Sequence, residues 1–208
     1  MNLPQMPANL TRTLILGSTS RYRRELLARL HTPFEVAAPD VDETPLPGEA
    51  PNAMARRLAL AKALAVAAQF PQAVVIGSDQ VADLGGQCLG KPGSHEKAVV
   101  QLRLMSGQMV VFQTAVAVVC RATGFEQLSL AAVKVKFRRL TDDEIENYLQ
   151  IEKPYDCAGS AKSEGLGITL LESIDSDDPT ALIGLPLIRT CQMLRAAGIE
   201  LLLPRSAA

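Results

Sequence analysis

An uninterrupted apolar run at positions 73–76 has the length and composition of a strand that is buried on both faces. Gly77 and Ser78 follow it, and Asp79 comes next. The pattern predicts that the strand ends at this Gly-Ser pair. Asp79 would then lie at the carboxyl end of the strand, where open α/β sheets bind their ligands.

The residues after Asp79 predict a tight hairpin. A short strand over residues 81–84 leads into Gly85-Gly86, a pair that turns easily because glycine adopts positive φ without steric cost. The return strand is expected to end at the sequence Gly-Lys-Pro of residues 90–92. Two interpretations stay open: Asp79 and Lys91 face one cleft, or Asp79 caps a turn and Lys91 is solvated.

Periodicity in the rest of the chain alternates between strands and helices. The fold class that we predict is therefore α/β, and a chain of 208 residues fits a single domain over residues 1–208 or two lobes that share a core. Residues 1–12 read as a loose N-terminal extension. The other expected strands are 13–16, 34–36, 109–120, 128–137 and 168–171. Helices are expected over 21–30, 52–70 and 94–105. Two more helices are expected, one after the capping box at 141–144 and one between Pro186 and Gly198.

The first turn of the helix predicted over residues 21–30 carries Arg21, Arg23 and Arg24. A helix N-terminus has partial positive charge and favours acidic residues, so three arginines there destabilise the helix unless an anion binds. A small polar turn, residues 17–20, joins the preceding strand to this helix. The combination favours a phosphate site, and the alternative is a solvated basic helix start.

Three further positions allow either a functional or an ordinary interpretation. The loop over residues 39–51 contains Asp40, Asp42 and Glu43, which are either solvated or a source of an oxygen ligand for a cation. Lys62 is an isolated charge in an apolar helix, and it either extends to solvent or points at a phosphate. Asp156 follows Pro-Tyr and is interpreted as a turn residue.

Composition limits the function classes. The formal net charge is −1, Trp is absent and aromatic residues are 4% of the chain, which argues against nucleic-acid binding. No apolar stretch approaches the ~20 residues of a membrane span, and the N-terminus does not read as a secretory signal. The four cysteines form no CxxC pair, which favours reduced thiols in the cytoplasm. Because the two histidines are also isolated, any metal is expected to be oxygen-bound, as Mg²⁺ or Mn²⁺.

Several motifs in this order resemble the Maf family of nucleoside triphosphate pyrophosphatases. The resemblance runs from Leu14 to about Leu194. It rests on Gly17-Ser18-Thr19-Ser20 with Arg23-Arg24, Val41-Asp42-Glu43, Ala61-Lys62-Ala63, Gly77-Ser78-Asp79-Gln80-Val81, Gly90-Lys91-Pro92 and Ala158-Gly159-Ser160. It implies an elongated α/β fold, a mixed sheet with flanking helices and two lobes around a deep cleft. It also implies a cytoplasmic enzyme that is often a homodimer and needs a divalent cation.

Within this family, the sequence is most similar to the branch that hydrolyses 7-methyl-GTP. That branch has an aromatic residue before the double arginine, Gln after the catalytic Asp and Glu in the AGSxKSEG loop, and these positions are Tyr22, Gln80 and Glu164 here. The resemblance therefore implies that these three residues determine substrate specificity. One departure from the family pattern is Arg21, which stands where proline is usual.

The resemblance also implies a chemistry and roles for individual residues. The bond between the α and β phosphates of a nucleoside triphosphate is cleaved, with Asp79 as the general base and Glu43 and Asp79 as metal ligands. The expected phosphate-binding residues are Ser18, Arg23, Arg24, Lys62 and Lys91. Two alternatives remain: an enzyme for dTTP, UTP or other modified nucleotides, and a nonenzymatic inhibitor of septum formation that acts through a partner.

Overall fold

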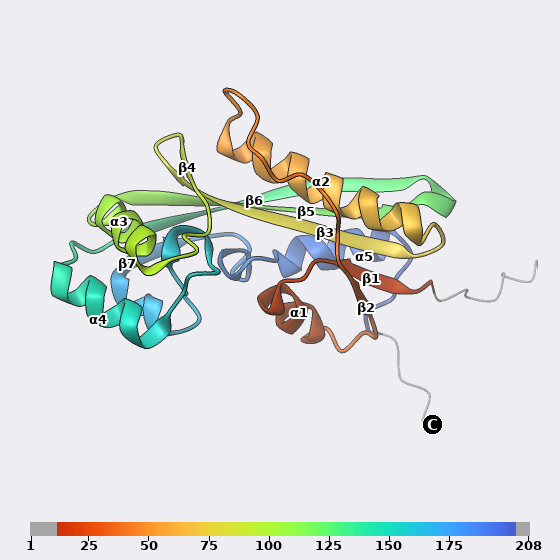
Figure 1. Cartoon of the computed structure of the whole chain (residues 1–208). Coiled ribbons are helices and arrows are strands. Elements are labelled where there is room, and N and C mark those ends of the chain that lie inside the picture. Colours follow the sequence, from red (N-terminus) through yellow and green to blue (C-terminus); the bar gives the residue numbers. More distant parts are fainter. Residues whose placement is uncertain (1–11, 203–208) are drawn as a thin grey trace, which may run out of the picture.

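The computed structural model describes residues 12–202, so residues 1–11 of the expected N-terminal extension lie outside the described residues. The described chain forms a seven-stranded mixed sheet in the order β2-β1-β3-β5-β6-β7, with β4 paired to β3. Figure 1 shows that the sheet is elongated, with helices on both of its faces. The predicted α/β class, a mixed sheet with flanking helices, is confirmed.

The parallel part of the sheet is short. Strand β1 (Leu14–Gly17) lies parallel to β2 (Glu35–Ala37) on one side and to β3 (Val74–Leu84) on the other. Its last pair with β3 joins Gly17 to Gly77. All four residues of β1 are buried, as expected for a central strand with both faces covered.

Our prediction that the central strand ends at Gly77-Ser78 is wrong. Strand β3 continues without interruption to Leu84, because β5 (Met109–Cys120) pairs with it from Val75 to Asp83. Asp79 therefore lies inside a strand, opposite Ala115. Asp79 nevertheless lies two residues beyond Gly77, the last β3 residue that pairs with β1. It is therefore close to the carboxyl end of the parallel strand β1, although it is not at the end of β3.

Antiparallel strands extend the sheet to its far edge. Strand β6 (Phe125–Phe137) pairs with β5 from Phe125 to Lys136, and β7 (Leu171–Asp175) forms the edge. The predicted hairpin is confirmed: β4 (Gln87–Leu89) folds back on β3, and Gly85 and Gly86 both have positive φ. The strand predicted over residues 168–171 is wrong, because Leu166–Leu170 form a 3₁₀ turn and β7 begins only at Leu171.

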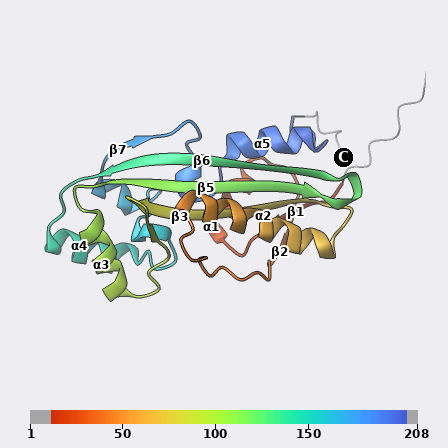
Figure 2. The same cartoon turned by 90° about the horizontal axis from the view of Figure 1, so that it is seen from above.

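Five α-helices lie within the described residues and match the predicted ones within about three residues at each end. They are α1 (Arg21–Ala28), α2 (Pro51–Gln69), α3 (His95–Met105), α4 (Asp142–Glu152) and α5 (Leu187–Ala196). Ser20, Ser94 and Thr141 cap α1, α3 and α4 with their side chains. Figure 2 shows the same arrangement from above, with β5 and β6 running the length of the molecule. None of these helices is long and apolar enough to cross a membrane.

The apolar core is divided between the two faces of the sheet. Helix α2 covers one face through Ala55, Ala59 and Ala63. Helices α1 and α5 cover the other face at the same end, through buried leucines and Met193. Helices α3 and α4 pack near the opposite end of the sheet, against Phe112 and its neighbours.

Close packing between α2 and β3 depends on Gly77. A Cβ atom at this position would lie 2.3 Å from the carbonyl oxygen of Ala59 and 2.5 Å from the amide nitrogen of Ala63. Real Cβ contacts are longer than this, so the helix lies as close to the strand as glycine allows. The next α2 residue toward the site is Lys62, which is buried.

Candidate active site

A short stretch of β3 is unpaired on one edge. Strand β1 pairs with β3 as far as Gly77, and β4 pairs with it from Ala82 onward. Within residues 12–202, no strand pairs with residues 78–81 on this edge. A pocket of about 370 Å³ opens here, and Asp79 and Gln80 both line it although they lie on opposite faces of the strand.

On the α2 face of this opening, Lys62 lies between two carboxylates. Its Nζ is 2.7 Å from Oδ1 of Asp79 and 2.8 Å from Oε1 of Glu43. The Lys62 and Asp79 side chains are almost fully buried, whereas Glu43 is exposed in the loop before α2. The structure thus brings together three of the predicted site residues. Burial opposes ionisation of Glu43, but the hydrogen bond and charge of Lys62, together with the charges of Lys91 and Arg23, outweigh this and hold the Glu43 pKa below its usual value.

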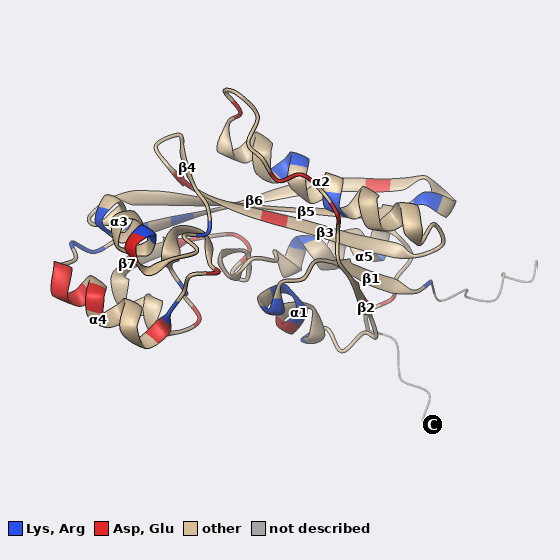
Figure 3. Ribbon diagram, in the orientation of Figure 1, with Lys and Arg blue, Asp and Glu red and all other residues tan. Residues whose placement is uncertain are grey.

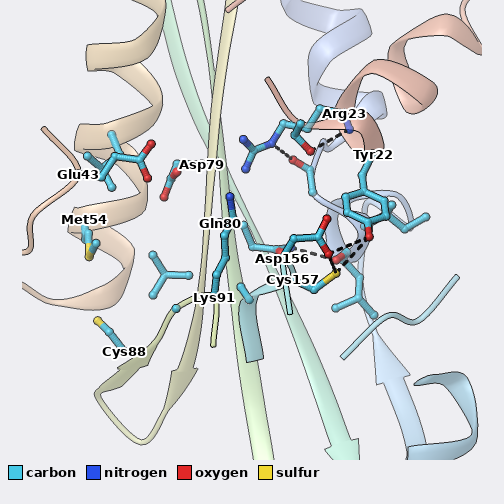
Figure 4. A pocket seen from close by; sticks show the side chains of 18 of the residues that line it. Tyr22, Arg23, Glu43, Met54, Asp79, Gln80, Cys88, Lys91, Asp156 and Cys157 are labelled. Atoms are coloured by element: carbon cyan, nitrogen blue, oxygen red, sulfur yellow. Dashed lines mark hydrogen bonds between the residues drawn. The ribbon is translucent and has the colours of Figure 1, made fainter. Parts of the chain in front are cut away.

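Arg23 reaches the pocket from the first turn of α1, whose basic start is visible in Figure 3. Its Nε donates to the carbonyl of Gly184 at 2.9 Å, and Nη1 lies 3.4 Å from Oγ of Ser18. Burial lowers the pKa of the Arg23 guanidinium, although the negative charges of Asp79 and Glu43 oppose this effect. The remaining guanidinium donors are directed toward the pocket, as Figure 4 shows.

The other predicted phosphate-binding residues occupy different positions. Lys91 lines the pocket from the end of the β4 hairpin and is exposed, so its ammonium is accessible to a ligand. Ser18 is buried and accepts hydrogen bonds from the amide of Ser20 and from Arg23, which places it behind Arg23 rather than on the pocket wall. Arg24 is exposed and is not among the residues that line the pocket.

The opposite side of the pocket carries Tyr22 and Asp156. The Tyr22 hydroxyl donates to Oδ1 of Asp156 at 3.1 Å and accepts from Nη2 of Arg21 at 2.6 Å. The Arg21 guanidinium also lies over the Tyr22 ring, 4.7 Å from its centroid. Burial raises the pKa of Tyr22, so its hydroxyl remains a neutral donor. Figure 4 shows Tyr22, Asp156 and Cys157 together, across the pocket from Glu43 and Asp79.

Asp156 is a pocket residue that our sequence interpretation missed. We interpreted it as a turn residue, and it does lie in a turn, but its carboxylate also lines the pocket and binds Tyr22, 134 positions earlier in the chain. Only the motif Ala158-Gly159-Ser160, two residues further along the chain, gave a signal that this stretch is close to the site. Gly184 was missed too, and its carbonyl orients Arg23.

Gln80 contacts the protein with its amide nitrogen. Nε2 lies 2.9 Å from Oγ1 of Thr114, 2.9 Å from the carbonyl of Ala181 and 3.0 Å from that of Leu182. The residue thereby holds the 181–183 turn against β3 and β5. Because its nitrogen is occupied in this way, the amide oxygen of Gln80 is the part of the side chain left for a ligand.

Glu164 lines the same pocket from the loop after α4 and is exposed. Partial desolvation of its carboxylate raises the pKa of Glu164, and the nearby Glu152 and Glu25 carboxylates add to this, while a hydrogen bond with its own amide and the charge of Lys162 oppose it. Two of the three predicted specificity residues, Tyr22 and Glu164, therefore present an aromatic ring and an acidic group to the pocket. Its lining thus includes cations, an aromatic ring and acidic groups in distinct positions.

The pocket offers few carboxylate oxygens as ligands for a divalent cation. Within the described residues, no cluster of three or more His, Cys, Asp or Glu side chains could hold a metal. Glu43 and Asp79 do converge on one cation, the Lys62 ammonium, so their oxygens fit a positive charge. Magnesium is commonly bound by one or two carboxylates together with substrate phosphates and water, which is the kind of site these two residues allow.

Comparison with known proteins identifies the family of this chain. The family model described as Maf-like protein matches residues 13–197. The chain belongs to the Maf family. The match includes every pocket residue discussed above, so the site is part of the Maf domain itself.

High-identity relatives of this Maf chain share one name. A 7-methyl-GTP pyrophosphatase of Polaromonas sp. (strain JS666 / ATCC BAA-500) is 76% identical over 195 residues, which are 94% of this chain and 89% of the relative. One of Albidiferax ferrireducens is 70% identical, with 95% and 99% of the two chains covered. One of Nitrosococcus oceani is 54% identical, with 97% and 100% covered. This Maf chain therefore spans nearly the full length of these three relatives.

Proposed function

We propose that this protein is a pyrophosphatase that hydrolyses 7-methyl-GTP to 7-methyl-GMP and pyrophosphate. The names of its high-identity relatives support this assignment. The observation that carries it is the separation of charge in the pocket. Arg23, Lys62 and Lys91 supply cations to the pocket that holds Asp79, whereas Tyr22 and Asp156 lie across this pocket from Asp79.

That separation suits a nucleotide with a negative tail and a positive base. The triphosphate would bind among Arg23, Lys62 and Lys91, which offset its charge. Methylation at N7 gives guanine a positive charge, which the Tyr22 ring attracts by about 0.5–2 kcal/mol depending on desolvation. An ionised Glu164 accepts hydrogen bonds without donating any, so it can pair with the N1–H and exocyclic amine of guanine. Thymine and uracil lack this pair of donors.

In the proposed reaction, Asp79 accepts the proton of the attacking water. Water adds its oxygen to phosphorus, the bond between the α and β phosphates breaks, and the two products are a monophosphate and pyrophosphate. Lys62 holds Asp79 in place through the 2.7 Å contact and, with Arg23 and Lys91, stabilises the negative charge that builds up on the phosphate oxygens. We also propose that Mg²⁺ or Mn²⁺ is held by Glu43 and Asp79, where its charge would further neutralise the phosphates.

Purified protein should be assayed with 7-methyl-GTP, GTP, dTTP and UTP, with Mg²⁺ or Mn²⁺, for release of pyrophosphate and monophosphate. We expect the highest kcat/KM with 7-methyl-GTP. Equal or better turnover of dTTP or UTP would refute the substrate assignment. Failure to hydrolyse any of the four nucleotides would refute the proposed enzymatic activity and favour a nonenzymatic protein that acts through a partner.

The double variant Tyr22→Ala with Glu164→Gln tests the basis of this selectivity. We expect it to lower kcat/KM for 7-methyl-GTP more than for the other three nucleotides. An equal loss with all four would contradict the proposed roles of both residues, even if hydrolysis itself were confirmed.

Two properties of the whole protein belong to the same proposal. We propose a cytoplasmic homodimer that binds a nucleotide and neither nucleic acid nor a membrane. The formal net charge of −1 gives no general attraction to nucleic acids. Light scattering during size-exclusion chromatography distinguishes a dimer of about twice the 22.3 kDa chain mass from a monomer.

A further inference from the structure

The loop that carries Glu164 is attached to the end of helix α4 by one carboxylate. Glu152 is the last residue of α4, and only 13% of its side chain is exposed. Its Oε1 lies 2.5 Å from Nζ of Lys162, and its Oε2 accepts a hydrogen bond from the amide of Leu166 at 2.7 Å. The two contacts hold both ends of a tight turn, residues 162–166, with Glu164 at its centre.

The turn is shaped to accommodate this carboxylate. The amide of Gly165 donates to the carbonyl of Lys162 at 3.1 Å, which closes the turn. A Cβ atom at position 165 would lie 2.6 Å from Oε2 and 3.1 Å from Oε1 of Glu152. The φ of Gly165 is −126°, outside the positive-φ region, and a side chain there would have to displace the Glu152 carboxylate.

A second α4 side chain holds the loop just before the turn. Tyr148, one helical turn before Glu152, donates from its hydroxyl to the carbonyl of Ser160 at 3.2 Å and accepts from the amide of Lys162 at 3.1 Å. Tyr148 is buried, so α4 presents a rigid surface to the loop. Glu164, at the centre of the turn, lines the pocket.

We propose that Glu152 is a positioning residue for substrate selectivity: by holding both ends of the 162–166 turn, it places the Glu164 carboxylate against the base of the nucleotide. This inference rests on the proposed function for its effect on substrates. Glu152 does not line the pocket and acts only through the turn. The Glu152 carboxylate also holds the Lys162 ammonium, so Lys162 is already paired with an acidic group other than Glu164.

The experiment compares Glu152→Ala and Glu152→Gln with Glu146→Gln. Glu146 lies on the same helix and bonds His95 and Gln150, with no bond to the turn, so it controls for the loss of an α4 carboxylate. We expect Glu152→Ala to lower the ratio of kcat/KM for 7-methyl-GTP to that for UTP, which lacks the paired donors that Glu164 accepts from, by about tenfold, the factor that corresponds to one hydrogen bond with a charged group. Glu152→Gln should retain part of the selectivity, because its amide oxygen can still accept from Leu166. Glu146→Gln should leave the ratio unchanged.

A double-variant cycle shows whether Glu152 acts through Glu164. In a Glu164→Gln background, adding Glu152→Ala should produce no further change in the ratio. Equal losses for both substrates in the folded Glu152→Ala protein, or a full additional loss in the double variant, would overturn the proposal.

Amide hydrogen exchange tests the clamp without any substrate. Residues 162–166 should exchange faster in Glu152→Ala than in the wild type or in Glu146→Gln, while the sheet keeps its protection. Unchanged exchange of this segment would overturn the positioning role. A wild-type protein that does not prefer 7-methyl-GTP would instead refute the proposed function, and the exchange comparison would still decide whether Glu152 holds the turn.

Discussion

The ammonium of Lys62 lies 2.7 Å from Oδ1 of Asp79, and both side chains are less than 10% exposed. The pair joins α2 to β3 at the point where the sheet loses its β1 partner. A buried pair of this kind is costly to break, because removal of one partner leaves the other as an uncompensated charge. The same contact therefore contributes to both the stability of the fold and the proposed chemistry. Substitutions of Lys62 and of Asp79 should differ in their effects on stability and activity.

For Asp79→Asn we expect a loss of about 10²–10⁴ in kcat with the fold retained, the usual effect of removing a general base. The amide keeps the shape of the side chain and can still accept from Lys62, whose other partner, Glu43, remains. Steady-state hydrolysis and circular dichroism should be measured on the same sample. A correctly folded Asp79→Asn protein with wild-type kcat would exclude Asp79 from the mechanism.

Substitutions of Lys62 and Lys91 should both lower activity, but only the substitution of Lys62 should also lower stability. Lys62→Ala leaves Asp79 buried without its partner, so it should lower both kcat/KM and the free energy of unfolding, the latter by up to about 3 kcal/mol. Lys91 is exposed at the pocket, and Lys91→Ala should lower kcat/KM without a measurable change in stability. Urea denaturation and kinetics of both variants check this. Two variants with wild-type kcat/KM would show that neither ammonium binds the phosphates.

Arg21 should weaken the preference for a cationic base. Its guanidinium covers one face of the Tyr22 ring and places a positive charge beside it. Arg21→Ala should therefore raise the 7-methyl-GTP to GTP ratio of kcat/KM about twofold to threefold at low salt, with a smaller effect at high salt. Arg24→Ala is the matched control, because Arg24 is exposed on the same helix and does not line the pocket. A fall of the ratio in Arg21→Ala would show instead that Arg21 supports Tyr22 in binding the base.

The ion pair between Glu152 and Lys162 should give stability a defined pH dependence. Burial opposes ionisation of Glu152, but the hydrogen bonds from Lys162 and Leu166 outweigh it and lower the pKa of Glu152. A lowered carboxyl pKa stabilises the fold above the ordinary value of about 4.3, and this contribution is lost as the pH falls through the folded pKa. The pKa of Lys162 is raised by Glu152, so its contribution is present below about 10.4 and is lost as the pH rises through its folded pKa.

The measurement is the difference in Tm between the wild type and Glu152→Gln across this range. It should be largest between about pH 5 and pH 10 and should shrink below about pH 4. Glu146→Gln serves as the reference for general effects of charge on α4. A difference that stays constant from pH 3 to pH 7 would show that the pair does not contribute through its charge.

Metal binding should depend on Glu43. The wild type is expected to need added Mg²⁺ or Mn²⁺ for turnover and to tolerate zinc chelators while either ion is in excess. Calorimetric titration with Mn²⁺ in the presence of a non-hydrolysable nucleotide should show weaker binding of the ion to Glu43→Gln. Full activity of metal-stripped enzyme with a chelator present would contradict the requirement.

Sequence patterns predicted the elements of this fold better than their pairing. The apolar run at 73–76 indicated a buried strand correctly, but its length depended on β5, which begins 25 residues after β3 ends and pairs with it through Asp83. No local signal shows that Gly77-Ser78 is paired across the sheet. The 3₁₀ turn at Leu166–Leu170 was mistaken for a strand for a similar reason, since a short apolar run does not distinguish the two.

The candidate site was predictable where residues carry a recognisable motif, and the structure places Tyr22, Arg23, Glu43, Lys62, Asp79, Gln80, Lys91 and Glu164 around one pocket. Contacts that depend on distant segments could not be predicted. Asp156 meets Tyr22 across 134 positions, and the nitrogen of Gln80 is bound by carbonyls about 100 residues away. Glu152 resembles any acidic residue at a helix end until the turn that folds onto it is known.

The missing side chain of Gly77 has a consequence for how natural variants of this protein should be interpreted. Because α2 rests against the bare backbone at this position, one added methyl group would displace the helix and, with it, Lys62 relative to Asp79. A substitution at residue 77 would then impair the enzyme while every recognised motif residue in the pocket stayed intact. Screening genomes for active copies by those side chains alone would count such a variant as functional.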